Sequence, residues 1–165
     1  MFSCFYAFMI YCVLHNIRSL YNVGSMFRTA DAAGIEKIYL TGYTPVPVDA
    51  FGKLRSEVVK TALGAEKNVP WENCRRISEA FRKLRKDDVQ IIALEQHTGT
   101  VDYHRIKPKR PFALVVGNEV RGLSLSVLKK CDIIVEIPMR GKKESLNVSV
   151  AFGIALFTLK DTSQK

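Results

Sequence analysis

The stretch FALVVGNE, residues 112–119, decides the fold class of this chain of 165 residues. Its first five residues are apolar, a run typical of a parallel strand that is covered on both faces. Gly117, Asn118 and Glu119 follow at once. Ligands of open parallel sheets bind beyond the carboxyl ends of the strands. We therefore predict an α/β fold with a binding pocket beyond this strand end.

Strand-like and helix-like segments alternate on both sides of this stretch. Further strands are predicted at residues 7–14, 37–41, 89–94 and 133–137, and helices at 22–33, 78–86, 124–130 and 148–159. Gly34 is the expected C-cap of the first helix, and Ser78 is a plausible N-cap of the second. This alternation indicates a mostly parallel sheet with helices on both faces.

The pattern contains no internal repeat and no linker. Hydrophobic residues make up 47% of the chain, enough for a proper core. We expect a single domain over residues 1–160, followed by a flexible tail at 161–165. The apolar residues 1–14 have no charged start and are too short to span a bilayer. The first six of them have no interpretation from the sequence.

The charge of the chain favours a polyanionic partner. Twenty-five Lys and Arg against sixteen Asp and Glu give a formal net charge of +9. A small basic protein is attracted to nucleic acid or to an anionic membrane surface, and charge alone favours nucleic acid. A solubility charge with no partner is the alternative.

The cysteines are scattered, at positions 4, 12, 74 and 131. No pair has C-x-x-C spacing and no histidine lies at ligand spacing, so we expect no metal site. Scattered thiols in a core-forming chain are typical of the reducing cytoplasm, where we expect this protein to act.

Two further segments carry polar residues where strands meet helices. Asn22 and Gly24 stand near the start of a predicted helix, where backbone N–H groups favour anions, and Arg28 lies about one turn after Gly24. An N-cap, a turn glycine and a surface arginine would look the same. The second segment, residues 137–151, contains Ser145 and Asn147 before the last helix, and one of them is a candidate cap.

Three segments together resemble the motifs of the SpoU/TrmH branch of the SPOUT methyltransferases. They are N-x-G-x-x-x-R-T-A at residues 22–30, G-N-E at 117–119, and I-P-M…S-L-N-V-S-V-A at 137–151. They occur in the family's order, and KTALGAE at 60–66 is further family-like sequence. One motif alone would be weak evidence, whereas three in order, each at a strand end, are specific.

The resemblance implies an S-adenosyl-L-methionine-dependent RNA 2′-O-ribose methyltransferase that releases S-adenosyl-L-homocysteine. It also implies an α/β fold with a C-terminal trefoil knot, and a homodimer with the last helix at or near the interface. The RNA is a tRNA or an rRNA, and no membrane or metal is involved. The residues that match the family's cofactor contacts are Leu94, Glu95, Gly117, Asn118, Ile137, Met139 and Leu146.

The resemblance also assigns the catalytic positions. Arg28 matches an arginine proposed to assist deprotonation of the ribose 2′-hydroxyl, although an arginine is a poor base by its pKa. Asn22 would orient that arginine or the substrate. Glu119, Ser145 and Asn147 match the family's other polar positions. No metal is required, because the sulfonium already activates the methyl group.

Basic residues near these motifs are expected to contact the RNA backbone. Those nearest the motifs are Arg18, Arg121, Arg140, Lys142 and Lys143, and those outside are Arg75, Arg76, Arg82, Lys83, Arg85, Lys86 and residues 107–110. A solvated basic surface is the alternative for each. Larger family members carry an N-terminal RNA-recognition extension. We expect none in this protein, so substrate choice is expected to depend on the catalytic domain or a partner.

Two other functions stay open at this point. A methyltransferase of the same fold could modify a base instead of a ribose. A protein that keeps the fold without turnover could bind RNA or assist assembly, although the intact Arg28, Glu119, Ser145 and Asn147 argue against loss of activity.

Overall fold

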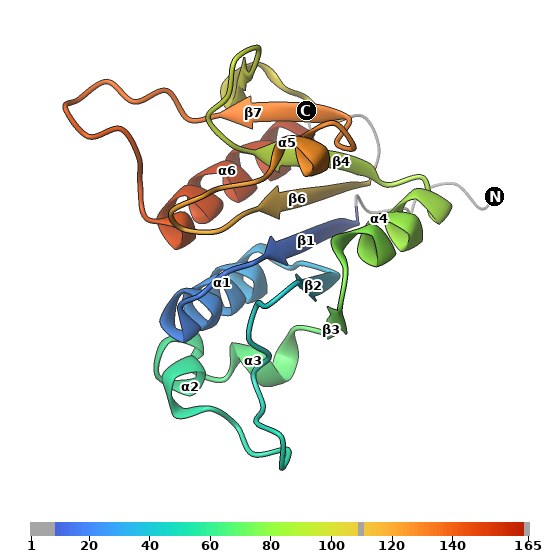
Figure 1. The fold of residues 1–165 in the computed structure, drawn as a ribbon, viewed down its shortest axis with the longest axis vertical. Coiled ribbons are helices and arrows are strands. Elements are labelled where there is room, and N and C mark those ends of the chain that lie inside the picture. Colours follow the sequence, from blue (N-terminus) through green and yellow to red (C-terminus); the bar gives the residue numbers. More distant parts are fainter. Residues whose placement is uncertain (1–8, 109–110, 164–165) are drawn as a thin grey trace.

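A computed structural model describes residues 9–108 and 111–163 of the chain (Figure 1). The unexplained residues 1–6, the first two residues of the predicted strand at 7–14, and two of the basic residues at 107–110 lie outside the described ranges.

The described residues form one seven-stranded sheet in which every pairing is parallel. The strand order is β3-β2-β1-β6-β4-β7-β5. The strands are β1 (Ile10–His15), β2 (Lys37–Thr41), β3 (Trp71–Cys74), β4 (Gln90–Leu94), β5 (Val101–Asp102), β6 (Phe112–Val116) and β7 (Ile133–Glu136). The stretch that opened the sequence analysis is thus a central strand, β6, between β1 and β4.

Helices cover both faces of this sheet. They are α1 (Leu20–Ala33), α2 (Ser56–Ala62), α3 (Ala65–Asn68), α4 (Ile77–Lys86), α5 (Leu125–Leu128) and α6 (Val148–Ser163), with a short 3₁₀ helix, η1 (Tyr103–Arg105). None of the helices in the described part of the chain is both long and apolar enough to cross a bilayer.

The strands have apolar side chains on both faces, as a doubly covered parallel sheet requires. On one face, Leu14 and Leu114 belong to a buried cluster with residues of α1 and α6. On the other face, Val13 and Val115 belong to a second cluster with residues of α4 and α5. The period-2 alternation of the strands separates the two clusters.

The first helix begins two residues earlier than predicted. Ser19 is its N-cap and accepts a hydrogen bond from the Asn22 N–H. Gly34 is its C-cap, with φ of 68°, as predicted. Gly24 lies inside the helix and is not a turn glycine. A Cβ on Gly24 would lie 2.1 Å from the Thr61 Oγ1 of α2, so Gly24 is required for close packing of α1 on α2.

We expect Gly24→Ala to lower the free energy of unfolding by about 1–3 kcal/mol through overpacking. The clash includes the backbone oxygen of Val58, at 2.5 Å from the added Cβ, which cannot move cheaply. This exceeds the gain of about 1 kcal/mol that alanine brings to a helix. Gly153→Ala in α6 is the matched control, because its Cβ would meet only the Thr29 Cγ2 at 3.4 Å. Equal denaturation midpoints for the two variants would contradict this packing role.

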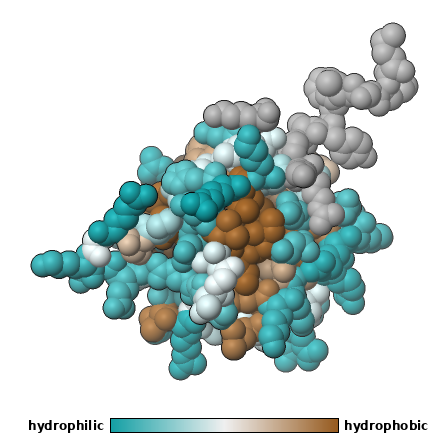
Figure 2. Space-filling view, turned by 90° about the horizontal axis from the view of Figure 1, so that it is seen from above, coloured by the Kyte–Doolittle hydropathy of each residue, from teal (hydrophilic) through white to brown (hydrophobic). Residues whose placement is uncertain are grey.

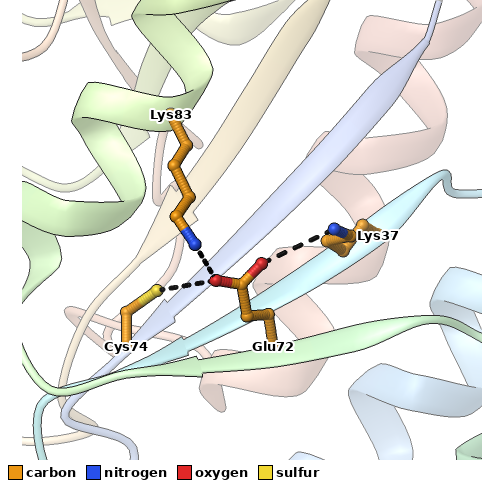
Figure 3. Close-up of polar contacts among 4 residues, drawn as sticks. All are labelled: Lys37, Glu72, Cys74 and Lys83. Atoms are coloured by element: carbon orange, nitrogen blue, oxygen red, sulfur yellow. Dashed lines mark hydrogen bonds and ion pairs between the residues drawn. The ribbon is translucent and has the colours of Figure 1, made fainter.

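The edge strand β3 is fastened by a charged cluster (Figure 3). The Glu72 carboxylate accepts a hydrogen bond from Lys83 of α4 and lies 3.5 Å from the Lys37 Nζ of β2. The contact with Lys83 lowers the pKa of Glu72 most strongly. The Cys74 thiol donates to the same carboxylate over 3.8 Å. The cluster therefore joins β3 to β2 and to α4.

Several boundaries differ from the prediction. Four elements, α2, α3, β3 and β5, have no counterpart among the predicted segments, and all of them are short or polar. Arg76 precedes α4 as its cap residue without a side-chain bond, so Ser78 is not the N-cap. The last helix continues through Ser163, so residues 161–163, expected in a flexible tail, are helical. Residues 164–165 lie outside the described ranges.

Candidate active site

A cavity of about 320 Å³ lies beyond the carboxyl ends of β4, β6 and β7. All seven residues assigned to the cofactor from the sequence line it, together with Glu119 and Ser145 of the catalytic set. They come from three separate segments of the chain: Leu94 and Glu95; Gly117, Asn118 and Glu119; and Ile137, Met139, Ser145 and Leu146. The topology thus brings strand ends that are distant in sequence to one place, as the prediction of a shared pocket required.

Gly117 lets the segment after β6 turn back on itself. A Cβ there would lie 2.6 Å from the carbonyl carbon of Gly122, which pairs with Asn118 in an isolated bridge. Gly122 has φ of 62°, and a Cβ on it would strike the Glu95 carboxylate at 2.2 Å. A glycine directly after a buried strand can leave room for a ligand, whereas the close neighbour of Gly117 is the chain's own backbone.

Asn118 holds this loop together from inside. Its side-chain Oδ1 accepts hydrogen bonds from the N–H groups of Val120 and Arg121, at 3.0 and 2.8 Å. Its Nδ2 donates to the Asn16 carbonyl at 3.0 Å. Glu95 adds a further restraint by accepting from the Leu123 N–H at 2.7 Å. Two side chains that line the cavity thereby fix the backbone around it.

Glu119 occupies the N-terminal end of α1. Its carboxylate accepts hydrogen bonds from the N–H groups of Arg18 and Ser19, at 3.0–3.1 Å, and from the Asn22 Nδ2 at 3.1 Å. Partial burial by itself raises the pKa of the Glu119 carboxyl. The hydrogen bonds from Ser19, Arg18 and Asn22 outweigh that effect, so the pKa lies below its ordinary value.

The anion predicted at this helix start is therefore the protein's own carboxylate. The sequence analysis expected outward-facing N–H groups near Asn22 and Gly24 to bind an external anion. Glu119 accepts from the N–H groups of Arg18 and Ser19, just before the helix, and the Asn22 N–H donates to the Ser19 Oγ, so these donors already have acceptors within the chain. A carboxylate with a lowered pKa is also a weak base, so Glu119 is suited to hold its neighbours in place.

Asn22 joins the last motif to this cluster. Its Oδ1 accepts a hydrogen bond from the Asn147 Nδ2 at 3.3 Å. The Asn147 Oδ1 accepts from the Ser149 N–H at 2.8 Å, so Asn147, and not Ser145, is the cap of α6. The chain Glu119–Asn22–Asn147 links all three motifs through side chains. Within the described residues, the side-chain hydrogen bonds of Asn22 go to these two residues and not to Arg28, one of the two groups, with the substrate, that it is predicted to orient.

Ser145 and the basic residues Arg140, Lys142 and Lys143 are exposed on the loop between β7 and α6. Figure 1 shows this loop extending away from the sheet before α6 begins. Met139 and Leu146 reach the cavity from the same loop. The loop thus carries apolar contacts for the cavity and positive charge beside it.

Arg28 does not line the cavity of its own chain. It lies six residues after Asn22 on α1, which turns its side chain about 240° around the helix axis. It is exposed in a separate depression with Lys60, Thr61 and Phe157. Two of the three motif segments therefore line the cavity. The first is joined to them only by the hydrogen bonds of Asn22, and its guanidinium lies elsewhere in the chain.

Four carboxylates line the cavity, and only Glu95 and Glu119 are among the site residues predicted from the sequence. Glu136 and Glu144 accompany Glu95. Their positions, the last residue of a strand and the loop before Ser145, were available signals. A cavity rich in carboxylates favours a cationic ligand.

Two of the basic residues expected to contact RNA have partners inside the protein. Lys83 bonds Glu72 (Figure 3), and the Arg85 Nη1 lies 3.6 Å from the Asp132 Oδ1. Arg18 and Arg121 are exposed beside the cavity, in an adjoining depression.

Comparison with known proteins identifies the family. The sequence model of the SpoU rRNA methylase family matches residues 9–157, most of the chain. The chain belongs to the SpoU methylase family. This confirms the resemblance drawn from the three motifs.

Named proteins and solved structures of the SpoU family are similar to this chain in sequence and in fold. The chain is 32% identical over 145 residues to the 23S rRNA (guanosine-2′-O-)-methyltransferase RlmB of Bordetella pertussis, covering 88% of this chain and 56% of that protein. An AdoMet-bound rRNA methyltransferase structure from Sinorhizobium meliloti matches with a TM-score of 0.80 and 32% identity, over 93% of this chain and 56% of that one. The TrmH/SpoU tRNA modifying enzyme of A. aeolicus matches with a TM-score of 0.81 and 26% identity, over 95% and 76%. The chain thus spans little more than half the length of the curated relatives it matches.

Proposed function

We propose that this SpoU-family chain transfers a methyl group from S-adenosyl-L-methionine to a ribose 2′-hydroxyl of tRNA or rRNA. The observation that carries the proposal is a cavity at the strand ends that is lined by two of the motif segments, 117–119 and 137–151, while Asn22 of the third segment is hydrogen-bonded to both. The relatives whose names specify 2′-O-methylation of rRNA support the reaction type.

The cavity fits the cofactor in size and chemistry. Its volume of about 320 Å³ lies within the usual range for small-molecule sites. Ile137, Met139 and Leu146 offer apolar contacts for an adenine ring. Glu95, Glu136 and Glu144 offer negative charge for a sulfonium and an ammonium group.

When bound, the cofactor supplies an activated methyl group, so the protein's task is alignment and proton removal. The Glu119–Asn22–Asn147 chain fixes the positions of the three loops around the cavity. Ser145 is exposed at the cavity, where its hydroxyl is placed to contact cofactor or ribose. Holding the two reactants in line lowers the barrier by several kcal/mol in comparable systems.

We assign proton removal to Arg28 together with an RNA phosphate. The guanidinium stabilises the developing alkoxide, and the phosphate oxygen takes the proton, because a guanidinium is already protonated and cannot accept another. Arg18, Arg121, Arg140, Lys142 and Lys143 contact the RNA backbone around the cavity, which their exposed positions support.

The chain is proposed to act as a homodimer. Val150, Ile154 and Phe157 of α6 are 50%, 38% and 41% exposed and lie on one stripe of the helix. Figure 2, which views the molecule from above the orientation of Figure 1, shows an apolar area framed by hydrophilic side chains on that face. Because Phe157 also borders the depression that holds Arg28, a partner on this stripe would bring the guanidinium to an interface. There it can serve the partner's cavity.

Phe157→Glu is expected to convert the dimer to a monomer, because a charge in an apolar interface is left without a partner. Light scattering after size-exclusion chromatography measures the mass directly. Phe51→Glu, at a 95% exposed aromatic residue between β2 and α2, is the control and should stay dimeric. A wild-type protein that is monomeric at micromolar concentration would contradict the proposed assembly.

The C-terminal trefoil knot implied by the resemblance is also part of the proposal. The order of the strands supports it, since β7 is inserted between β4 and β5 before the chain crosses to α6. Thr162 of α6 donates a hydrogen bond to the Ile106 carbonyl, after η1, which places the last helix against the segment before β6.

We place the protein in the cytoplasm, where tRNA and rRNA are modified. Within the described residues, Cys12, Cys74 and Cys131 are free thiols, which suits a reducing compartment.

Mapping of 2′-O-methylation in total RNA, with and without the gene, tests the proposed function. One or more sites in tRNA or rRNA should lose methylation in the deletion strain and regain it when the wild-type gene is restored. An unchanged methylation map would contradict the proposal.

A further inference from the structure

A second depression adjoins the cofactor cavity and shares Asn118 and Val120 with it. It lies beyond the ends of β1 and β2, on the other side of the loop after β6. Its other prominent lining residues are Arg18, Tyr43 and Arg121. A polymer whose ribose is held at the cavity must continue over neighbouring surface, and this depression is the surface next to it.

Tyr43 is held at both ends while its ring stays open to solvent. Its backbone N–H donates to the Asn16 Oδ1 at 3.2 Å, and its hydroxyl accepts from the Asn118 Nδ2 at 3.0 Å. The side chain is nevertheless 58% exposed. A large aromatic ring that is both fixed and exposed loses little entropy when another ring stacks on it.

The backbone conformations of Asn16 and Gly42 place Tyr43 in this position. Asn16 has φ of 58°, an uncommon conformation for a residue other than glycine. Gly42 has φ of 65°, and a Cβ on it would lie 1.9 Å from the Asn16 Oδ1 that Tyr43 uses. The Asn16 Nδ2 donates to the His15 Nε2 at 3.2 Å, and burial lowers the pKa of His15, which favours the neutral ring that can accept. These contacts fix the position of Tyr43.

The two arginines supply positive charge without internal neutralisation. Within residues 9–108 and 111–163, neither the Arg18 nor the Arg121 side chain forms an ion pair with a carboxylate. The backbone of each is fixed, Arg18 through its N–H to Glu119 and Arg121 through its N–H to Asn118. Two free guanidiniums beside an aromatic ring match the phosphate and the base of a nucleotide.

We propose that this depression binds a nucleotide of the substrate RNA next to the methylated one, with its base stacked on Tyr43 and its phosphate held by Arg18 and Arg121. The inference rests on the proposed function for the identity of the ligand as RNA. Stacking on Tyr43 tolerates any base, so the subsite recognises an unstacked, single-stranded neighbour and not a particular sequence. The hydrogen bond from Asn118 to Tyr43 couples the subsite to the cofactor cavity.

RNA binding by point variants tests the subsite without relying on methyl transfer. The probe is a fluorescein-labelled single-stranded oligoribonucleotide of mixed sequence, and fluorescence anisotropy gives the Kd. Tyr43→Ala should weaken binding about fivefold or more, as loss of one stacked base does. Tyr43→Phe keeps the ring and should bind within about twofold of wild type. Phe51→Ala, at a 95% exposed aromatic in the same connection between β2 and α2, is the matched control and should bind as wild type does.

The contribution of the arginine charge to RNA binding is measured separately, through the salt dependence of Kd. Arg121→Ala should reduce the slope of log Kd against log salt by about 0.7, the value for one phosphate contact with a single strand. Tyr43→Ala should leave that slope unchanged. The melting temperature should fall to a similar degree in Tyr43→Ala and Tyr43→Phe, because both lose the hydrogen bond that Asn118 donates to the Tyr43 hydroxyl. Weaker RNA binding in Tyr43→Ala alone then reports the loss of the ring.

The results separate this inference from the proposed function. If Tyr43→Ala binds the oligoribonucleotide as tightly as wild type, or if Tyr43→Phe is as weak as Tyr43→Ala, the stacking subsite is wrong even if the wild-type protein methylates RNA. If the wild-type protein binds the oligoribonucleotide through Tyr43 but does not transfer methyl groups to RNA, the proposed function fails and the subsite stands.

Discussion

Arg28→Ala is expected to lower the rate of methyl transfer to RNA about 100-fold or more, while the affinity for S-adenosyl-L-methionine stays at the wild-type value. Removal of a group that stabilises charge in the transition state has an effect of this size in other enzymes. Cofactor affinity is preserved because Arg28 lies outside the cavity, in the depression with Lys60 and Phe157. Single-turnover transfer of a radiolabelled methyl group measures the rate, and calorimetry measures the affinity.

Lys60→Ala is the matched control for this prediction. Lys60 lines the same depression and is exposed, so its loss removes one positive charge from the same place. If the effect of Arg28 were general attraction of RNA, both variants would lose activity to the same degree. A normal transfer rate for purified Arg28→Ala would remove Arg28 from the mechanism.

Mixing two inactive variants tests whether Arg28 serves the partner's cavity. Gly117→Val should lose cofactor binding, because a side chain there meets the backbone of Gly122. When it is refolded together with Arg28→Ala, mixed dimers contain one cavity with an intact lining and one intact guanidinium on the other subunit. Partial recovery of transfer supports action across the interface. No recovery, with mixed dimers demonstrated, places both groups in one subunit.

Glu119→Ala is expected to lower the free energy of unfolding by about 1–3 kcal/mol and to lower the transfer rate as well. The substitution leaves the N–H groups of Arg18 and Ser19 and the amide of Asn22 without their acceptor. Asn22 then no longer holds Asn147, so the start of α6 shifts relative to the cavity. Chemical denaturation gives the stability, and the single-turnover assay gives the rate.

The pH dependence of stability identifies the charge of Glu119 as the cause. Its pKa in the folded protein is lower than the ordinary value of 4.5. The unfolded state therefore takes up the proton first. The stabilisation is fully present above the unfolded pKa and is lost as the pH falls through 4.5 toward the folded pKa. The difference in stability between wild type and Glu119→Gln should accordingly be constant from pH 6 to 8 and shrink below about 4.5. A difference that does not change with pH would show that the shape of the side chain, and not its charge, matters.

The sequence predicted the sheet well where strands are long and apolar. Residues 37–41 and 112–116 have the predicted bounds, because continuous β-branched and aromatic runs have few other solutions in a globular chain. The two-residue strand β5 and the polar edge strand β3 depend on tertiary partners, such as the bond from Lys83 to Glu72 (Figure 3). No local pattern indicates such strands.

The sequence predicted which residues lie at the site, but not what each of them does there. Polar residues after strands marked the cavity, since parallel strands end at one edge. The roles of the glycines were harder to predict, because Gly24 and Gly117 make room for Val58 and Gly122 of the chain itself. A sequence does not distinguish that use from room for a ligand. Arg28 was placed with the cavity by motif membership, whereas helical periodicity turns it toward α2 and α6.

The most direct measurement is the chemical position of the transferred methyl group. Wild-type protein, isotopically methyl-labelled S-adenosyl-L-methionine and total RNA from a strain that lacks the gene are incubated together. The RNA is then digested to nucleosides for tandem mass spectrometry. Our account predicts that the label stays with the sugar fragment when the glycosidic bond breaks. A label that stays with the base, or RNA that acquires no label while the protein binds the cofactor, would contradict it.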